Sequence, residues 1–83
     1  MRILYFAWVR ERAGAAEETV SPPAGLTTVG QLADWLATRS PGHAAAFADR
    51  RRLRVAINQE QARFDDPVGP GDEVAFFPPM TGG

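Results

Sequence analysis

Two adjacent prolines, Pro78 and Pro79, follow a run of strand-forming residues at 73–77, near the end of the 83-residue sequence. Proline has no backbone N–H and a fixed φ angle, so the pair ends a sheet ladder and the chain continues in an extended form. The residues beyond the prolines are too few to fold on their own. We therefore expect one domain over residues 1–77 and an extended, flexible tail over residues 78–83.

The tail ends in Gly82-Gly83, the slimmest peptide that can enter a narrow channel and still present an α-carboxylate. At about 3.3 Å per extended residue, the tail could reach roughly 20 Å. One interpretation is that Gly83 is the working group of the chain. The segment that threads into a partner would then be Pro78, Pro79, Met80, Thr81 and Gly82. The alternative is a frayed terminus without a function, because chain ends are usually disordered.

The composition excludes several classes of function. The absence of cysteine rules out disulfides, thiolate metal sites and cysteine nucleophiles. All nine basic residues are arginine, and a formal net charge of -1 gives no bulk attraction to nucleic acid or anionic membranes. With one histidine, no P-loop and no HExxH motif, the sequence predicts no bound cofactor, ATP or metal ion. No apolar run spans a bilayer and no signal peptide is recognisable, so we expect a cytoplasmic protein.

The first half of the sequence predicts two strands and a helix. Residues 2–9 form an apolar run without a breaker, which predicts a central strand, and residues 17–20 predict a second strand in a hairpin with it. Thr28 and Gln31 have the spacing of a capping box, which starts the main helix. Its apolar stripe at helical spacing consists of Val29, Leu32, Ala33 and Leu36. Pro41 ends this helix near Arg39, and residues 43–48 could form one further helical turn.

The second half predicts strands over residues 53–57, 61–64 and 73–77, separated by turns. Local rules alone indicate a small α+β sheet with one helix. The order strand, strand, helix, strand, short strand, strand is similar to the β-grasp arrangement of ubiquitin-like domains. That arrangement implies a mixed sheet of four to five strands crossed by one main helix, with the last strand beside the first.

Three stretches carry a resemblance to a known family. They are Phe6-Ala7-x-Val9-Arg10-Glu11, Ala56-Ile57-Asn58-Gln59 and the final run Gly-Asp-Glu-Val-Ala-Phe-Phe-Pro-Pro-x-Thr-Gly-Gly at 71–83. A Gly-Gly end alone is weak, since about 7% of residues are glycine in any protein, but after Phe-Phe-Pro-Pro it is specific. Over nearly its whole length the chain resembles the MoaD/ThiS family of sulfur carriers, and within it the small subunits of molybdopterin synthase.

The resemblance implies a defined chemistry for Gly83. A ubiquitin-activating-type enzyme would use ATP to adenylate its carboxylate, and a sulfur donor would convert the acyl-adenylate to a thiocarboxylate. Threaded into the large subunit of molybdopterin synthase, the ionised sulfur would be delivered to cyclic pyranopterin monophosphate in molybdenum cofactor biosynthesis. On this account the chain is not an enzyme by itself. The resemblance also implies a heterotetramer, with two small subunits at opposite ends of a large-subunit dimer.

Phe6 and Phe77 lie on the first and last predicted strands, which are neighbours in a β-grasp sheet. If the helix covers one face, aromatic side chains on the other face form a docking patch for partner proteins. The alternative is that both complete the core, and the apolar pattern cannot decide because both faces of each strand are apolar. The resemblance implies that Arg10, at the end of the first strand, helps to hold the partner; a solvated arginine is the alternative.

Other polar residues favour structural interpretations. The cluster at 50–52 with Arg54 has no interleaved aromatic residues, so we interpret it as a solvated loop rather than a phosphate or RNA patch. His43 has no second metal ligand nearby in the sequence. Asp65-Asp66 precedes Pro67 in a turn, where aspartate caps the backbone.

Two other functions stay open at this point. The chain could carry sulfur for thiamine or another thiolated product, or act as a ubiquitin-like modifier, although its length and the Phe-Phe-Pro-Pro-x-Thr run argue against thiamine. It could also be a β-grasp binding module that uses the arginine loop and not the C-terminus.

Overall fold

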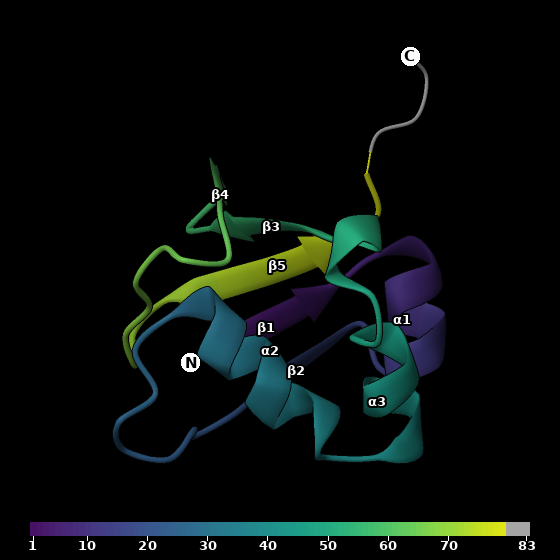
Figure 1. The fold of residues 1–83 in the computed structure, drawn as a ribbon, viewed down its shortest axis with the longest axis horizontal. Helices are drawn as coiled ribbons and strands as arrows, with labels where there is room; N and C mark the ends of the chain where they lie inside the picture. Colours follow the sequence, from purple (N-terminus) through teal and green to yellow (C-terminus); the bar gives the residue numbers. More distant parts are fainter. Residues whose placement is uncertain (80–83) are drawn as a thin grey trace.

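The computed structural model describes residues 1–79, which form one five-stranded sheet with helices (Figure 1). The strands are β1 (Arg2–Tyr5), β2 (Glu17–Thr19), β3 (Arg54–Ile57), β4 (Glu60–Ala62) and β5 (Glu73–Phe77). Their order is β2-β1-β5-β3-β4, with β1 and β5 parallel and the other neighbouring pairs antiparallel. This mixed sheet, with the last strand beside the first, confirms the predicted β-grasp arrangement.

The helices in this part of the chain are α1 (Ala7–Ala13), α2 (Val29–Ala37), α3 (Pro41–Ala46) and a short 3₁₀ helix, η1 (Arg50–Arg52). Figure 1 shows α2 and α3 on the same side of the sheet, and α1 packs against α3 beside the end of β1. No helix within residues 1–79 is long and apolar enough to cross a membrane.

The core lies between the helices and one face of the sheet. Side chains alternate along a strand, so the cross-strand partners Tyr5, Phe76 and Val55 point to the same side. Each of them is at most 1% exposed. The Phe76 ring stacks on Tyr5 at 6.5 Å between centroids and meets the edge of Phe47 at 4.9 Å. The structure thereby decides the strand phase that the apolar pattern left open.

The predicted main helix is confirmed as α2. Thr28 Oγ1 accepts a hydrogen bond from the Gln31 backbone at 3.2 Å, and Gln31 Oε1 accepts one from the Thr28 backbone at 3.1 Å, which completes the capping box. The whole predicted apolar stripe is buried. Ser40 caps α3 and Pro41 occupies its first turn, so the further helical turn lies at 41–46, two residues earlier than predicted.

The prediction of a first strand over residues 2–9 is wrong beyond Tyr5. Ala7 has a φ angle of 53°, which turns the chain out of the sheet and into α1. The helix buries Val9 and ends at Gly14, whose φ angle of 86° suits a left-handed C-cap. An apolar run without glycine or proline satisfies either a strand or a helix, so the sequence carried no signal for the change. β2 still pairs with β1 as predicted, but α1 joins them where a tight turn was expected.

The predicted turn at 58–60 is confirmed as a two-residue hairpin between β3 and β4. Ile57 pairs with Glu60, and the residues between them, Asn58 and Gln59, have φ angles of 50° and 71°. Two successive positive φ angles define a type I′ turn, in which glycine is favoured at the second position. β4 starts one residue earlier than predicted and ends at Ala62.

We predict that Gln59→Gly raises the free energy of unfolding by about 0.5–1 kcal/mol. A left-handed L-residue costs about 1–2 kcal/mol, and the greater freedom of glycine in the unfolded chain offsets part of the gain. Urea unfolding of the wild type, Gln59→Gly and Gln59→Ala measures this. Alanine keeps the Cβ atom and should show no gain; equal stability of the glycine and alanine variants would contradict the assignment.

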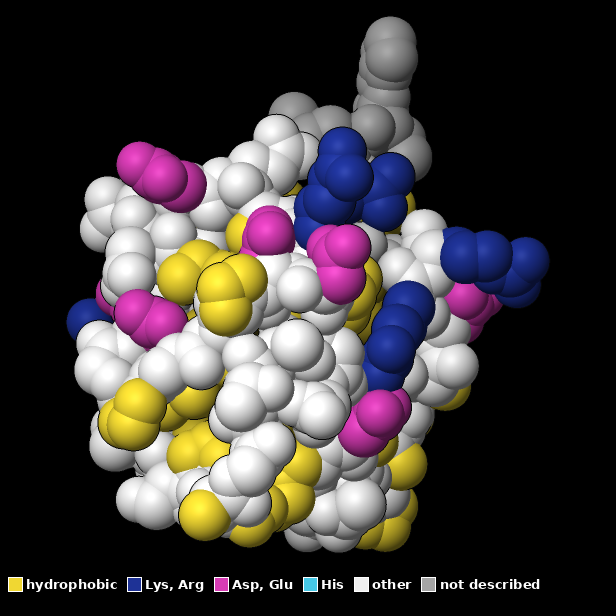
Figure 2. Space-filling model, turned by 60° about the vertical axis from the view of Figure 1, so that its left-hand side comes forward, with side chains coloured by type: hydrophobic (Ala, Val, Ile, Leu, Met, Phe, Trp, Pro, Cys, Tyr) yellow, Lys and Arg dark blue, Asp and Glu magenta, His cyan; other side chains and the backbone are white. Residues whose placement is uncertain are grey.

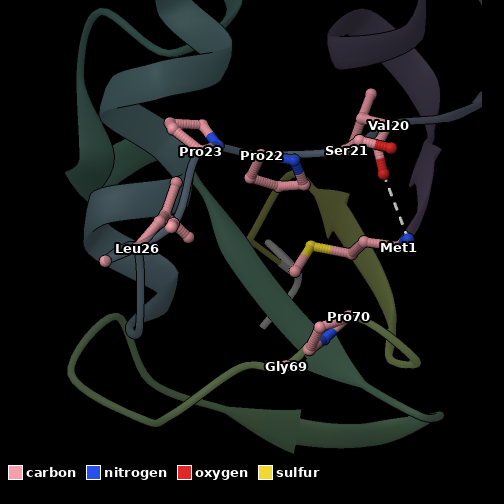
Figure 3. A pocket seen from close by; sticks show the side chains of 10 residues that line it. Met1, Val20, Ser21, Pro22, Pro23, Leu26, Gly69 and Pro70 are labelled. Atoms are coloured by element: carbon pink, nitrogen blue, oxygen red, sulfur yellow. Dashed lines mark hydrogen bonds between the residues drawn. The ribbon is translucent and has the colours of Figure 1, made fainter.

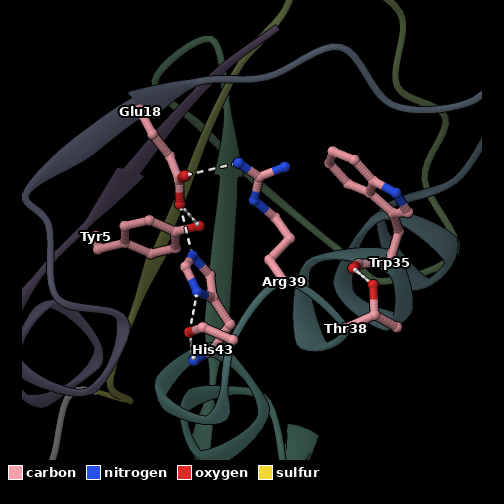
Figure 4. Close-up of polar contacts among 7 residues, drawn as sticks. Tyr5, Glu18, Trp35, Thr38, Arg39 and His43 are labelled. Carbon is pink, nitrogen blue, oxygen red and sulfur yellow. Dashed lines mark hydrogen bonds and ion pairs between the residues drawn. The ribbon is translucent and has the colours of Figure 1, made fainter.

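A partly buried polar cluster ties the helices to the sheet (Figure 4). Glu18 on β2 accepts hydrogen bonds from Tyr5 Oη and His43 Nε2, both at 2.7 Å, and lies 3.5 Å from the Arg39 guanidinium. Ser40 Oγ lies 2.7 Å from His43 Nδ1 on the other side of the ring. Because a carboxylate only accepts, His43 carries a proton on Nε2. The single histidine is therefore a structural link from β2 to α3, in line with the interpretation from the sequence.

This cluster predicts acid sensitivity through Glu18. Burial raises the pKa of Glu18, but hydrogen bonds from His43 and Tyr5 and the nearby Arg39 charge outweigh burial and hold the pKa below its usual value. A carboxyl whose pKa is lower in the folded state stabilises the protein above its unfolded pKa, and this contribution disappears as the pH falls through the folded value. Between about pH 5 and pH 3, the wild type should lose about 1–2 kcal/mol more stability than Glu18→Gln.

Chemical denaturation across that pH range provides the measurement. Glu17→Gln is the matched control, because its carboxyl is 53% exposed and pairs with Arg2 at the surface. Parallel pH profiles for the wild type and Glu18→Gln would show that the cluster does not depend on the Glu18 charge.

Candidate docking face and tail base

The face of the sheet that points away from the core is apolar at its centre. The strand alternation that buries Tyr5 and Phe76 turns Leu4, Ala75 and Phe77 outward, and each of these is half-buried. Leu4 pairs with Ala75, which also pairs with Ala56 of β3, so the small and apolar side chains form one row. We call this surface, Leu4, Phe6, Ala56, Ala75 and Phe77, the docking face.

Phe6 and Phe77 lie side by side at one end of this face. Phe6 follows β1 directly with an extended backbone, and its N–H donates to the Phe76 carbonyl at 3.1 Å. In a parallel ladder that bond places Phe6 opposite the next residue, Phe77. Phe6 is 50% exposed and is the large hydrophobic residue that the described part of the chain leaves in solvent. The structure thus brings the two predicted aromatic residues together, although Phe6 lies just beyond the strand.

Arg10 does not lie at a strand end as predicted. It is an exposed residue of α1, and its N–H reaches back to the Phe6 carbonyl at 3.4 Å, so it lies one helical turn from Phe6. The correction has the same cause as the shortened first strand, namely the left-handed turn at Ala7. A role for Arg10 in holding a partner stays a prediction.

The tail begins beside these residues. β5 ends at Phe77, and Pro78 and Pro79 carry the chain away from the sheet (Figure 1). The predicted threading residues Met80, Thr81 and Gly82, and the predicted working group Gly83, lie outside the described residues. Because β1 and β5 are parallel, the exit of the tail and the Phe6–Phe77 pair share one end of the sheet.

The rest of the described chain offers little catalytic chemistry. Residues 1–79 contain no group of three or more His, Cys, Asp or Glu side chains that could hold a metal ion. A hollow of about 310 Å³ opens where β1 and β5 begin, at the end of the sheet opposite the tail (Figure 3). Apart from Ser21, its lining is glycine and apolar side chains, among them Met1, Pro22 and Leu26, so it contains no side-chain acid or base.

Sequence reasoning missed three members of the docking face, namely Leu4, Ala56 and Ala75. Each of them lies in an apolar run whose two faces have the same pattern. The outward positions are identified only when the structure shows that the adjacent residues in the strand are buried. Arg54 gives a partial signal in the sequence, because its charged side chain must point to solvent. Once the pairing of Arg54 with Phe77 across β3 and β5 is known, this signal assigns Phe77 to the outward face.

The assigned phase predicts opposite behaviour for two adjacent aromatic residues. Phe76→Ala should lower the free energy of unfolding by about 3–5 kcal/mol, because it empties a site in a packed core. Phe77→Ala, on the outward face, should lower it by less than about 1.5 kcal/mol, since the ring is only partly buried. Equilibrium unfolding of both variants measures the difference; a larger loss for Phe77→Ala would reverse the phase.

A five-stranded mixed sheet with the chain end leaving its centre defines the class of ubiquitin-like β-grasp proteins. Within that class, residues 3–83 match the model of the ThiS family, and the chain belongs to this family. It is 43% identical to the molybdopterin synthase sulfur carrier subunit of Escherichia coli, covering 100% of this chain and 99% of that protein. The human molybdopterin synthase sulfur carrier subunit is 36% identical, covering 100% of this chain and 93% of that protein.

A solved structure agrees with these relatives. The crystal structure of SAMP1 from Haloferax volcanii, a small archaeal modifier protein, superposes with a TM-score of 0.74 at 32% identity. The match covers 100% of this chain and 98% of that one.

Proposed function

We propose that this chain is the sulfur carrier subunit of a molybdopterin synthase and works through the carboxylate of Gly83. The observation that carries the proposal is the full-length similarity to sulfur carrier subunits of that enzyme, 43% for the Escherichia coli protein. The fold supports it, because β5 runs from the centre of the sheet directly into Pro78 and Pro79, beside an exposed apolar face. The chain's role is that of a carrying subunit, and its cytoplasmic location stays a prediction.

The chemistry follows from the poor reactivity of a carboxylate. An adenylating partner joins the Gly83 carboxylate to the AMP portion of ATP and releases pyrophosphate. A hydrosulfide equivalent then attacks the acyl carbon, AMP leaves, and a thiocarboxylate remains. The thiocarboxylate is ionised at neutral pH, and its sulfur is a good nucleophile toward cyclic pyranopterin monophosphate in the large subunit. Transfer leaves Gly83 as a carboxylate again after hydrolysis, ready for another cycle.

The division of labour fits the side chains. The described residues hold one histidine, which is engaged with Glu18 and Ser40, and the sequence has neither cysteine nor lysine. General acid–base and nucleophilic chemistry would therefore come from the large subunit and the adenylating enzyme. The docking face and the tail would position the sulfur of the thiocarboxylate for transfer, which is the contribution that a carrier makes to such a reaction.

Intact-mass measurement after incubation with an adenylating enzyme, ATP and a sulfur donor tests the carrier role. The wild type should gain the mass difference between one sulfur and one oxygen. Deletion of Gly83, or one residue added after it, should abolish the gain while circular dichroism stays unchanged. An unchanged mass gain in the deletion variant would refute Gly83 as the carrier.

We predict that side chains of the docking face contribute to the affinity for the large subunit. Phe6→Asp should weaken binding to the large subunit by about 10- to 100-fold, because it places a charge among desolvated apolar side chains at an interface. Ala24→Asp is the matched control, since Ala24 is exposed in the loop at the opposite end of the sheet. Isothermal titration calorimetry measures both; equal affinities would show that the partner docks elsewhere.

The similarity to SAMP1 supports a second candidate, a ubiquitin-like protein modifier. Both functions use the same activated C-terminus, and they differ in whether sulfur or a lysine amine receives the acyl group. The printed sequence has no lysine, so chains linked through lysine of this protein could not form. Mass spectrometry of tagged protein from its host would separate the two functions by the presence of isopeptide-linked targets.

A further inference from the structure

Five arginines have no carboxylate within ion-pair distance in residues 1–79. They are Arg10, Arg12, Arg52, Arg54 and Arg63, which we call the arginine collar. The other four arginines each pair with a carboxylate, as Arg2 does with Glu17 and Glu73. All five collar residues are exposed. A paired surface arginine is largely neutralised locally, whereas the collar keeps its charge available to a partner.

The fold gathers the collar around the exit of the tail. Arg10 and Arg12 belong to α1, which starts where β1 ends, and β1 ends beside the last residues of β5. Arg54 pairs directly with Phe77. Arg63 follows Ala62, whose partner Val55 is the neighbour of Arg54, and Arg52 lies two residues before the start of β3. Figure 2 shows several dark-blue side chains on one side of the molecule, with magenta side chains between some of them.

Two features hold collar guanidiniums in place without neutralising them. The Trp8 ring lies between Arg12, at 4.6 Å from its centroid, and Arg52, at 5.3 Å. Cation–π contacts of this kind orient a guanidinium and leave its N–H groups free for acceptors. Arg54 and Arg63 border a shallow hollow of about 320 Å³ whose lining includes Val55 and Phe64. The collar is therefore a shaped surface with a concave, positive edge.

The collar continues the docking face. Arg54 adjoins Phe77, and Phe77 adjoins Phe6, so one row across the sheet changes from apolar to cationic. An apolar centre bordered by charge is the anatomy of a protein–protein interface. A nucleic acid is the less suitable occupant, because the formal net charge is -1 and gives no bulk attraction to a polyanion.

We propose that the arginine collar, through Arg54 and Arg63 above all, docks on an acidic protein surface around the channel of the large subunit that receives the tail. The complementary charges steer the tail to the channel and raise the association rate. The inference rests on the proposed function for the identity of the partner. The collar residues lie outside the family stretches that led to that function, apart from Arg10.

Stopped-flow association with the cognate large subunit tests the proposal, at about 10 mM and about 150 mM salt, where the screening length falls from about 30 Å to about 8 Å. At low salt, Arg54→Gln/Arg63→Gln should associate about 3- to 10-fold more slowly than the wild type, with a dissociation rate changed by less than about 2-fold. At high salt the difference should shrink to less than about 2-fold.

Arg2→Gln/Arg51→Gln is the matched control. It removes the same two charges, but Arg2 and Arg51 already pair with carboxylates and Arg2 lies at the opposite end of the sheet. This control should change the association rate by less than about 2-fold. Equal slowing of association in both double variants would show that net charge alone, and not the position of the arginines, sets the rate, and would overturn the proposal. Unchanged association of Arg54→Gln/Arg63→Gln at low salt would also overturn it.

The outcomes separate this inference from the proposed function. A wild type that does not bind the large subunit at all refutes the proposed function and the inference with it. A wild type that binds, together with an unaffected Arg54→Gln/Arg63→Gln variant, refutes the collar alone. If the variant instead loses binding only to a single-stranded RNA probe, the collar serves a nucleic acid and the acidic protein surface is the wrong partner.

Discussion

The parallel pairing of β1 with β5 is the constraint on which the remaining structure depends. It brings residues from the two ends of the chain together at the centre of the sheet, with Ile3 opposite Val74 and Tyr5 opposite Phe76. A strand in that position has neighbours on both sides, so its backbone groups are satisfied along its whole length. The chain therefore continues into Pro78 and Pro79 from the central strand of the sheet.

The two faces of the sheet that this pairing forms have different environments. One face is closed by α2 and α3, with Tyr5, Phe47 and Phe76 in mutual contact and Glu18 and His43 linking β2 to α3. The other face carries the half-buried apolar row of Leu4, Ala56 and Ala75. The fold provides this apolar surface without weakening the core, because the two faces share only the backbone.

The charged side chains also differ between the two ends of β1 and β5. Where β1 and β5 begin, Arg2 bridges Glu17 and Glu73, and Asp72 accepts hydrogen bonds from Asn58 and the Gly69 backbone that lower its pKa. Where the two strands end, the arginines have no carboxylate partner among the described residues. A net charge of -1 therefore conceals an uneven distribution that composition alone could not reveal.

Local chemistry in the sequence determined the elements that need no distant partner. The capping box at Thr28, the proline stop at Pro41, the turn at Asn58 and the end of β5 at Pro78 all act within a few residues, so they could be predicted correctly. The family stretches likewise indicated a sulfur carrier, in agreement with the match to the ThiS family.

Tertiary structure alone decided the phase of the strands, the start of α1 and the grouping of the arginines. An apolar run satisfies a strand face, the opposite face or a helix equally well, and burial against Phe76 and Phe47 selects one of these. The left-handed turn at Ala7 has no glycine to indicate it, and it is accompanied by the burial of Val9 and the packing of α1 against α3. Arg12 is far from Arg54 and Arg63 in the sequence, and only the fold places α1 and the β3–β4 hairpin at the same end of the sheet.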